Sequence, residues 1–542
     1  MPTFTIDGKE VEIEPALGNL IRHGSKHGVH IPHYCYHAGL SVPGNCRMCM
    51  VEVESDTPAG RRKALTTACT TRPAPGMAVD TQSKLVKDTQ KSVMEFLLIN
   101  HPLDCPVCDQ AGECDLQDYS YQYGSGDSRF QEAKVVQPKK DIGEHILLYA
   151  DRCIRCTRCI RFCDEVSGTS ELGYFYRGVY NEIDVFPGVR LDNRLSGNTV
   201  DICPVGALLD KEFLFKQRVW FLDGVESLCA GCSAGCNIRI DINRNNNRIY
   251  RLKPRENAEV NQFWMCDDGR HGWHYVHADT RLTAPMLRAG EGWTAASWGE
   301  ALERVRQGFE GVKAGGGSVA GVLSGHLTNE ENYLFARLMK EVIGSEKVGL
   351  RSKVSDEGDV KFKSGFTIRA DKSPNSRGAR DMASALGLTL TEMPDLLRQI
   401  EEGTVQGLYL LGGDPVERLT EAERAAFAKL KFLVVQDILT SDLVSVAHVL
   451  LPGAAFAEKE GTFTNCDGRV QRLRRAFPPP GEAKADWEVV RDAAEALGGK
   501  LDFVSAREVM EEVAQKVPGY AGMTYEALGG AGMAVQAETQ SP

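Results

Sequence analysis

The sequence predicts a multidomain chain that joins α+β and α/β parts. Three observations support this fold class: the length of 542 residues, the uneven distribution of cysteine, and a change of local pattern along the chain. Sixteen of the seventeen cysteines precede residue 270, and the later residues have an ordinary globular composition. A hydrophobic content of 42% is enough for several cores, and the length suggests about three to five domains.

The first cysteine-rich segment opens on a β-hairpin. Residues 4–6 and 11–13 alternate as strand residues do, Asp7-Gly8 supplies the turn, and a helix is expected over about 16–27. The next loop contains glycine and asparagine, which let the backbone curl with its N–H groups facing inward. Four thiolates on such a loop suit a 2Fe–2S cluster, although the plant-type ferredoxin pattern has a shorter first gap. A zinc site is the alternative, but zinc ribbons favour two separated Cys-x-x-Cys pairs. The group consists of Cys35, Cys46, Cys49 and Cys69, with gaps of ten, two and nineteen residues.

The second group combines one histidine with three cysteines. This set suits either an iron–sulfur cluster or a structural zinc ion, because a neutral imidazole can ligate both metals. A helix expected over 85–100 delivers the histidine directly into the cysteine loop, and the cluster motifs on either side favour iron. The group consists of His101, Cys105, Cys108 and Cys114.

The third group is the strongest signal in the chain. Three cysteines at two-residue gaps precede a remote fourth cysteine that is followed by proline, as in bacterial ferredoxins. This arrangement predicts a 4Fe–4S cluster. Cys163 extends the local run, but no second cysteine triplet lies near the fourth ligand, so Cys163 is interpreted as a buried or free thiol. The group consists of Cys153, Cys156, Cys159 and Cys203.

The fourth group also contains four cysteines, with gaps of two, three and twenty-nine residues. Four thiolates again allow a 4Fe–4S cluster. Zinc remains an alternative, because the spacing alone does not exclude it. The group consists of Cys229, Cys232, Cys236 and Cys266.

The second half predicts a parallel α/β layer. Ser297 and Glu300 form the pattern of a capping box that opens a helix, and Thr328 with Glu331 marks a second helix start. Buried strands are expected over 319–323, 408–411 and 432–435. Strands that alternate with helices in this way imply a parallel sheet. The stretch 478–481 is interpreted as a linker, and the tail 536–542 is expected to fray.

The order of these four motifs resembles that of the large iron–sulfur subunit of bacterial NADH:quinone oxidoreductase, respiratory complex I. The second half resembles the molybdopterin-oxidoreductase fold in Gly412-Gly413-Asp414-Pro415 and in the run 460–471. The resemblance implies one 2Fe–2S and three 4Fe–4S clusters, with the fourth cluster to one side of the main electron path. It divides the chain into a 2Fe–2S ferredoxin-like (β-grasp) domain over 1–82, a histidine-plus-three-cysteine 4Fe–4S module over 83–122, a 4Fe–4S ferredoxin-like domain over 123–218, a molybdopterin-oxidoreductase-type 4Fe–4S domain over 219–275 and a truncated molybdopterin-oxidoreductase-like α/β scaffold over 276–542.

The chain departs from catalytic members of the molybdopterin-oxidoreductase fold. No cysteine lies between Cys266 and Cys466, so the usual stretch for a molybdenum ligand is empty. Asp268 stands where catalytic relatives typically have lysine, and the sequence after about Asp486 is short for the final pterin-binding domain. Cys466 is interpreted as a packing residue. We therefore expect a scaffold without molybdopterin.

The resemblance implies an electron-transfer subunit that receives electrons from the NADH- and FMN-binding subunit and passes them towards quinone, coupled to proton translocation. The implied partners are that subunit, further iron–sulfur subunits of the peripheral arm and, indirectly, the membrane arm. The implied place is peripheral, on the cytoplasmic side of the bacterial inner membrane. One alternative is an iron–sulfur subunit of an NAD-linked formate dehydrogenase or hydrogenase. A zinc-stabilised structural scaffold is an alternative from another class.

Other functions find little support in the sequence. A net charge of −11 argues against a nucleic-acid surface, and no apolar run is long enough for a membrane span. The sequence opens on a strand and not on a signal peptide, and a reducing cytosol suits metal-bound thiolates better than disulfides. No phosphate-binding glycine loop and no catalytic triad or carboxylate pair can be singled out. Catalytic residues on this chain are therefore not expected.

Overall fold

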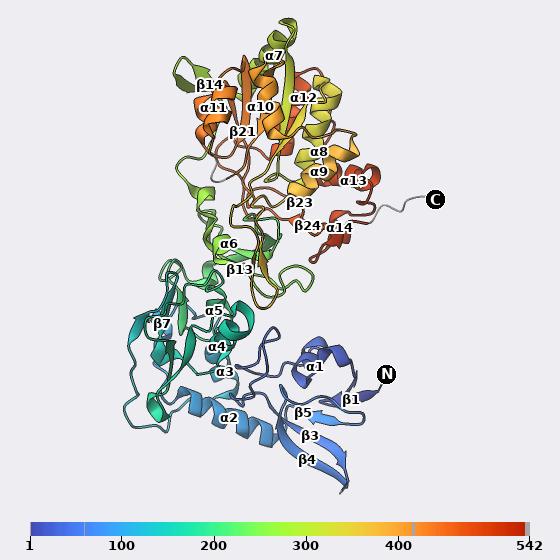
Figure 1. The fold of residues 1–542 in the computed structure, drawn as a ribbon. Coiled ribbons are helices and arrows are strands. Elements are labelled where there is room, and N and C mark those ends of the chain that lie inside the picture. Colours follow the sequence, from blue (N-terminus) through green and yellow to red (C-terminus); the bar gives the residue numbers. More distant parts are fainter. Residues whose placement is uncertain (1, 59, 415–417, 537–542) are drawn as a thin grey trace. The chain divides into compact units, whose positions relative to one another are not determined.

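The computed structural model describes residues 2–58, 60–414 and 418–536 (Figure 1). The chain forms two compact units. Unit 1 comprises Met1–Leu222 and Phe362–Phe366, and unit 2 comprises Asp223–Lys361 and Thr367–Pro542. Pro415 of the glycine motif and nearly all of the tail that was expected to fray lie outside the described residues. None of the described helices has both the length and the apolar character needed to cross a membrane.

A five-stranded sheet with the order β2-β1-β5-β3-β4 begins unit 1. The hairpin predicted at the amino terminus is confirmed: β1 and β2 pair antiparallel, and Asp7 and Gly8 between them have φ angles of 50° and 80°. Both angles lie in the left-handed region that a tight primed turn requires. Strand β5 joins β1 in parallel. The strands are β1 (Thr3–Ile6), β2 (Lys9–Glu12), β3 (Met50–Thr57), β4 (Gly60–Thr67) and β5 (Ala78–Asp80).

The first helix is shorter than the sequence predicts. Helix α1 spans Leu20–Lys26, whereas the expected helix began near residue 16. Gly18 adopts a φ angle of 76°, which no right-handed helix contains, and a short 3-10 turn precedes it. Asn19 then caps α1, with its side-chain oxygen accepting a hydrogen bond from the Arg22 backbone. The glycine and the cap together move the helix start by one turn.

The rest of unit 1 consists of short elements joined by long loops. The helix predicted over 85–100 is confirmed as α2, which Ser83 caps. A three-stranded sheet has the order β10-β7-β6, and β8 pairs with β9. The elements are α2 (Lys84–Leu98), α3 (Asp115–Tyr123), β6 (Lys139–Asp141), β7 (Ile146–Tyr149), α4 (Arg158–Phe162), β8 (Leu172–Phe175), β9 (Glu182–Val185), α5 (Asn198–Asp201) and β10 (Leu208–Asp210).

Unit 2 begins with a small antiparallel sheet of β11 (Asp223–Leu228), β12 (Asn237–Asn243) and β13 (Arg248–Pro254). Its main feature is a seven-stranded sheet with the order β15-β14-β22-β21-β20-β16-β17. The five strands from β22 to β17 run parallel, and β14 and β15 extend one edge antiparallel. This arrangement confirms the predicted parallel α/β layer.

Both faces of the central sheet are buried. In β20, Tyr409 and Leu411 face a core formed with α7, α8, α9, α12 and α13, whereas Leu408 and Leu410 face a core formed with α10 and α11. Burial on both faces explains why the strands are continuous hydrophobic runs. The predicted capping boxes are present at the starts of α7 and α8. The elements are α6 (Asp267–His271), β14 (Met286–Ala289), β15 (Gly292–Ala295), α7 (Trp298–Ala314), β16 (Ser318–Ser324), α8 (Asn329–Arg337), β17 (Val348–Arg351), β18 (Val360–Lys361), β19 (Thr367–Ile368), α9 (Ser376–Ala385), α10 (Met393–Glu401), β20 (Val405–Leu411), α11 (Glu421–Phe427), β21 (Phe432–Asp437), β22 (Val449–Pro452), β23 (Gly461–Thr464), β24 (Arg469–Leu473), α12 (Asp486–Ala496), α13 (Ala506–Lys516), α14 (Tyr525–Leu528) and β25 (Met533–Ala534).

Candidate iron–sulfur sites

The first cysteine group lies at one end of the five-stranded sheet. Cys49 immediately precedes β3, and Cys69 follows the end of β4, while Cys35 and Cys46 belong to the loop between α1 and β3. All but Cys46 are almost fully buried. The expected curl of the loop is present, because Gly44 has a φ angle of 64°. The backbone N–H of Cys35 points at the Cys46 sulfur at 3.5 Å.

The second group lies on the loop between α2 and α3, where Cys114 is the residue before the first turn of α3. Cys108 and Cys114 are buried, whereas Cys105 is exposed. Burial, assisted by the charge of Arg152, lowers the pKa of His101 to about 4, so its imidazole is neutral at pH 7. The ring also forms a hydrogen bond to the backbone of Arg152, as metal-binding histidines commonly do. Among the described residues, no hydrogen bond joins this ring to one of the three thiols.

The third group surrounds a small cavity. All four of its cysteines line this space, together with apolar residues from β7, β9 and β10 and with Arg158 from α4. The first three cysteines follow β7, and the fourth arrives after α5. Arg155 and Thr157 have φ angles of 57° and 65°, so the backbone between the cysteines turns sharply. A cavity lined by four thiols and otherwise mostly apolar has the ligand chemistry that a 4Fe–4S cluster needs.

The fourth group lies in unit 2, on the loop between β11 and β12 and at the start of α6. Cys229 follows β11 directly, Cys236 precedes β12 directly, and Cys266 precedes α6. All four thiols of the group are buried. The loop is held by the β23–β24 hairpin, because the Cys466 N–H donates to the Ser233 oxygen at 2.8 Å and the Gln471 amide donates to the Gly235 oxygen at 2.9 Å.

The chemistry of these sulfur atoms fits bound metal. Burial raises the pKa of the Cys114, Cys153, Cys156 and Cys229 thiols to about 12, so the bare thiols would stay protonated at pH 7. Buried thiolates need a cation beside them, and the iron of a bound cluster would supply one. Backbone N–H groups also point at sulfur in the third and fourth groups: Arg155 to Cys153 at 3.3 Å, Gly231 to Cys229 at 3.4 Å and Gly269 to Cys266 at 3.3 Å. Such hydrogen bonds tune cluster potentials.

Three of the four groups meet in one hydrophobic core of unit 1. This shared core contains Cys35 of the first group, Cys114 of the second and Cys156 of the third, packed with Tyr34, Met48, Met94, Leu116, Tyr119, Val205 and Ala207. Cys46, Cys153 and Cys203 border it. Among the four groups, the fourth is absent from this core and lies in the other unit.

The third group contacts both of the others. Arg161 of α4 donates to the Cys35 oxygen at 2.5 Å and to the Ser41 oxygen, both in the loop of the first group. On the other side, the Cys114 thiol donates to the Pro204 oxygen at 3.8 Å. A Cβ atom at Gly206 would lie 2.2 Å from the Cys108 sulfur. The segment between Cys203 and β10 therefore contacts two cysteines of the second group.

The arginines that join these loops were not predicted from the sequence. Arg152, Arg158 and Arg161 alternate with the cysteines of the third group, and this spacing was the available signal.

Cys163 is fully buried, in agreement with its interpretation as a buried or free thiol. No three His, Cys, Asp or Glu side chains of the described chain are arranged to hold a single metal ion.

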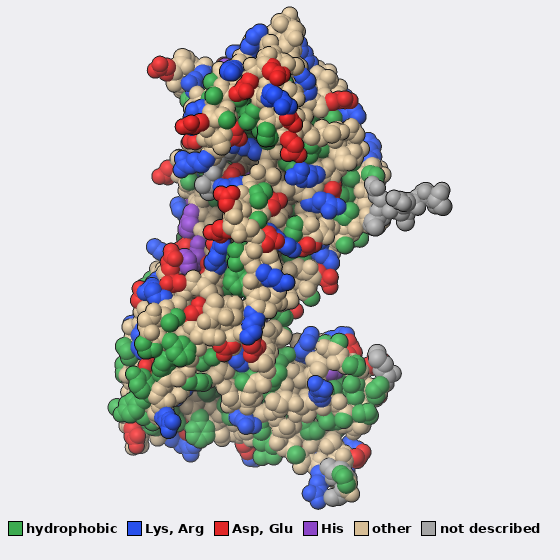
Figure 2. All heavy atoms as spheres, viewed as in Figure 1, with side chains coloured by type: hydrophobic (Ala, Val, Ile, Leu, Met, Phe, Trp, Pro, Cys, Tyr) green, Lys and Arg blue, Asp and Glu red, His purple; other side chains and the backbone are tan. Residues whose placement is uncertain are grey.

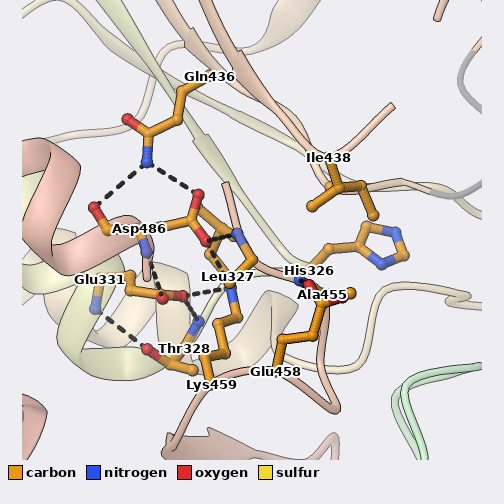
Figure 3. A network of polar contacts seen from close by, with 12 residues as sticks. His326, Leu327, Thr328, Glu331, Gln436, Ile438, Ala455, Glu458, Lys459 and Asp486 are labelled. Carbon is orange, nitrogen blue, oxygen red and sulfur yellow. Dashed lines mark hydrogen bonds and ion pairs between the residues drawn. The ribbon is translucent and has the colours of Figure 1, made fainter. Parts of the chain in front are cut away.

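A buried network of charges holds the α/β scaffold of unit 2 (Figure 3). The Lys459 ammonium lies 2.8 Å from a carboxylate oxygen of Glu331 and 2.8 Å from one of Asp486. The three side chains are at most 2% exposed. Glu331 also accepts the Thr328 N–H of the α8 cap, and Gln436 of β21 donates to Asp486. Lys459 thus joins the starts of α8 and α12.

Large exposed hydrophobic residues gather on unit 1. Of the eighteen such residues among those that the structure describes, sixteen belong to unit 1 and two, Val354 and Val504, belong to unit 2. Figure 2 shows hydrophobic side chains clustered over the part of this unit that carries β7. Exposed apolar residues that form a contiguous patch are typical of surfaces that bind partners.

Family models match nearly the whole chain. A 2Fe–2S iron–sulfur cluster binding domain matches residues 1–84, and the NADH-ubiquinone oxidoreductase-G iron–sulfur binding region matches 90–129. The ferredoxin-like domain of NADH-quinone oxidoreductase subunit 3 matches 143–209. The molybdopterin oxidoreductase Fe4S4 domain matches 223–278, and the molybdopterin oxidoreductase model matches 281–367 and 372–496. The predicted fold class is confirmed.

Curated relatives are similar over almost their full length. The NADH-ubiquinone oxidoreductase 78 kDa subunit of Neurospora crassa is 32% identical over 95% of this chain and 84% of its own. An NADH-quinone oxidoreductase subunit of Rickettsia bellii is 31% identical over 96% of this chain and 90% of its own. A solved structure of an NAD+-reducing nickel–iron hydrogenase covers 40% of this chain, with 27% identity and a TM-score of 0.36. The chain belongs to the family of the large iron–sulfur subunit of NADH:quinone oxidoreductase, as the identity to its curated members shows.

Proposed function

We propose that this chain is the subunit that conducts electrons through the peripheral arm of an NADH:quinone oxidoreductase. It would receive them from an NADH- and FMN-binding subunit and deliver them, through further iron–sulfur subunits, towards quinone. The energy released would drive proton translocation in the membrane arm. The chain would lie peripherally on the cytoplasmic side of a bacterial inner membrane. The observation that carries this proposal is the shared core, in which cysteines of three groups pack together.

The ligand sets follow the four cysteine groups. The first would hold a 2Fe–2S cluster, and the other three would hold 4Fe–4S clusters, with His101 as the one nitrogen ligand. Each bound cluster would supply a one-electron carrier whose potential depends on charge, burial and hydrogen bonds to sulfur. The proposal also includes the five domains expected from the sequence, with the bounds 1–82, 83–122, 123–218, 219–275 and 276–542.

The contacts of the third group favour the order first, third, second for the electron path. Arg161 of α4 donates a hydrogen bond to the loop of the first group. Gly206, which follows the last cysteine of the third group, packs against the Cys108 sulfur of the second group. The fourth group lies in unit 2 and is absent from the shared core, and its resemblance to the family's side cluster suggests a structural or storage role away from the main path. The exposed hydrophobic residues of unit 1 provide surface for the partner subunits.

Elemental analysis of anaerobically purified protein tests the cofactor set. About 14 iron atoms per chain, without molybdenum or zinc, would match one two-iron and three four-iron clusters. About one molybdenum would instead favour a formate dehydrogenase subunit, and stoichiometric zinc with a deficit of iron would identify a structural zinc site.

The substitution Cys156→Ser tests the electron path in the assembled complex. It should remove the signal of one 4Fe–4S cluster and stop turnover from NADH to quinone. Full turnover in a complex that lacks this cluster would refute the main-path assignment.

A further inference from the structure

A buried positive charge lies beside the four thiols of the third group. Arg158 of α4 is 8% exposed and lines the same cavity as Cys153, Cys156, Cys159 and Cys203. An arginine side chain stays protonated in proteins, so its charge cannot be removed by deprotonation. Burial of a charge without an opposite charge beside it is costly. The surroundings of Arg158 must therefore supply a negative charge.

Among the described residues, no carboxylate lies within ion-pair distance of Arg158. Arg158 donates to two backbone oxygens, those of Ile202 at 3.1 Å and Tyr36 at 2.6 Å, and its Nε atom has no hydrogen-bond partner among the described atoms. It forms no ion pair within the described part of the chain. Asp115 feels its charge only at longer range, and burial keeps the pKa of that carboxyl raised.

Arg152, six residues earlier, shows what a neutralised arginine looks like in the same unit. Its side chain is 2% exposed, but its guanidinium lies 2.7 Å from a carboxylate oxygen of Asp104. The two arginines are similarly buried, but Arg152 directly precedes the cysteine motif of the third group and Arg158 lies inside it. They differ in their surroundings: Arg152 lies beside the Asp104 carboxylate, whereas Arg158 lines a cavity with four sulfur atoms.

We infer that Arg158 is the internal counter-ion of the third cluster and raises its reduction potential. A 4Fe–4S cluster with four thiolate ligands is anionic, and it gains one further negative charge when it accepts one electron from a neighbouring cluster. A fixed positive charge beside it stabilises the reduced form more than the oxidised form. This inference rests on the proposed function, because it requires a cluster in the cavity. Arg158 acts on the cluster through its charge and does not itself react.

Redox titration of the assembled complex, followed by electron paramagnetic resonance, tests the inference. The signal of the third cluster is identified as the one that disappears in Cys156→Ser. In Arg158→Gln, which keeps a hydrogen-bond donor but removes the charge, the midpoint potential of this signal should fall. We expect the reduction equilibrium to change at least tenfold, which corresponds to about 59 mV for a one-electron couple. Arg158→Lys keeps the charge, and its potential should stay closer to that of the parent.

A matched control separates charge from general damage. Arg281 is 5% exposed and forms an ion pair with Glu458 at 2.7 Å in unit 2, so Arg281→Gln should lower stability and leave this potential unchanged. An unchanged or raised potential in Arg158→Gln, with the cluster retained, would overturn the inference. If the glutamine variant loses the cluster, retention in the lysine variant supports the charge, and loss in both variants overturns it. Survival of all cluster signals in Cys156→Ser would refute the proposed function instead.

Discussion

Lys459 offers a sharp test of the forces that hold the α/β scaffold. In Lys459→Met, the methylene volume is largely kept, but Glu331 and Asp486 lose the cation that each contacts at 2.8 Å. Removal of one partner from a buried ion pair typically costs about 3–5 kcal/mol. Both carboxylates keep other hydrogen bonds, from Thr328 and Gln436 among others, so the lower part of this range is the better expectation.

Urea unfolding of the purified chain, followed by tryptophan fluorescence, measures this loss. Five of the six tryptophans lie in unit 2, and Trp487 is next to Asp486, so the signal reports mainly on this unit. With a urea dependence of about 3 kcal/mol per molar, a loss of that size lowers the transition midpoint by roughly 1 M. The control is Lys500→Met, whose ion pair with Asp502 is exposed and should contribute at most about 1 kcal/mol.

The pH dependence of the loss distinguishes electrostatics from packing. Burial already raises the pKa of Glu331, and removal of the nearby ammonium raises it further. An acid whose pKa is higher in the folded state destabilises the protein above that pKa, and the penalty shrinks as pH falls and the carboxyl becomes neutral. The difference between Lys459→Met and the parent should therefore decrease towards pH 5. A midpoint equal to that of Lys500→Met, or a loss independent of pH, would refute the reasoning.

Three further substitutions probe other parts of the chain. Gly206→Ala places a Cβ atom 2.2 Å from the Cys108 sulfur and should remove the electron paramagnetic resonance signal of the second cluster. The control Gly126→Ala adds a Cβ atom that meets nothing within 4 Å and should keep this signal. Equal spectra for the two variants would contradict the packing of Gly206 against Cys108. Burial raises the pKa of Glu330 to about 7, so stability should fall as pH rises from about 4.5 to 7, and Glu330→Gln should abolish this slope in thermal unfolding across pH. Cys232→Ser should impair assembly and thermal stability more than NADH-to-quinone turnover; a turnover as low as that of Cys156→Ser would contradict the side position of the fourth group.

Features that depend on neighbouring residues were predictable from the sequence. The turn at Asp7-Gly8 and the capping boxes of α7 and α8 form as expected, because each depends on residues at most a few positions apart. The start of α1 was wrong because a single left-handed glycine, Gly18, interrupts an otherwise helical pattern.

Features that depend on tertiary packing were not predictable. The spacing of the cysteines groups them into ligand sets, but no spacing indicates that Cys35, Cys114 and Cys156 share one core. In the same way, the sequence shows that Arg158 lies between two cysteines. Its burial, and the absence of a carboxylate beside it among the described residues, become visible only in three dimensions.

The shared core has a consequence for how the three sites respond to one another. A medium of packed aromatic and aliphatic side chains screens charge far less than water does, so a charge added at one site acts on the next with little attenuation. An electron on any one of the three clusters would make its neighbours harder to reduce. Their titration curves would then broaden and overlap, and the apparent midpoints would belong to the set as a whole, in the manner of coupled acids. Because of this repulsion, the arrival of a second electron at a neighbouring cluster would favour transfer of the first electron to the next carrier.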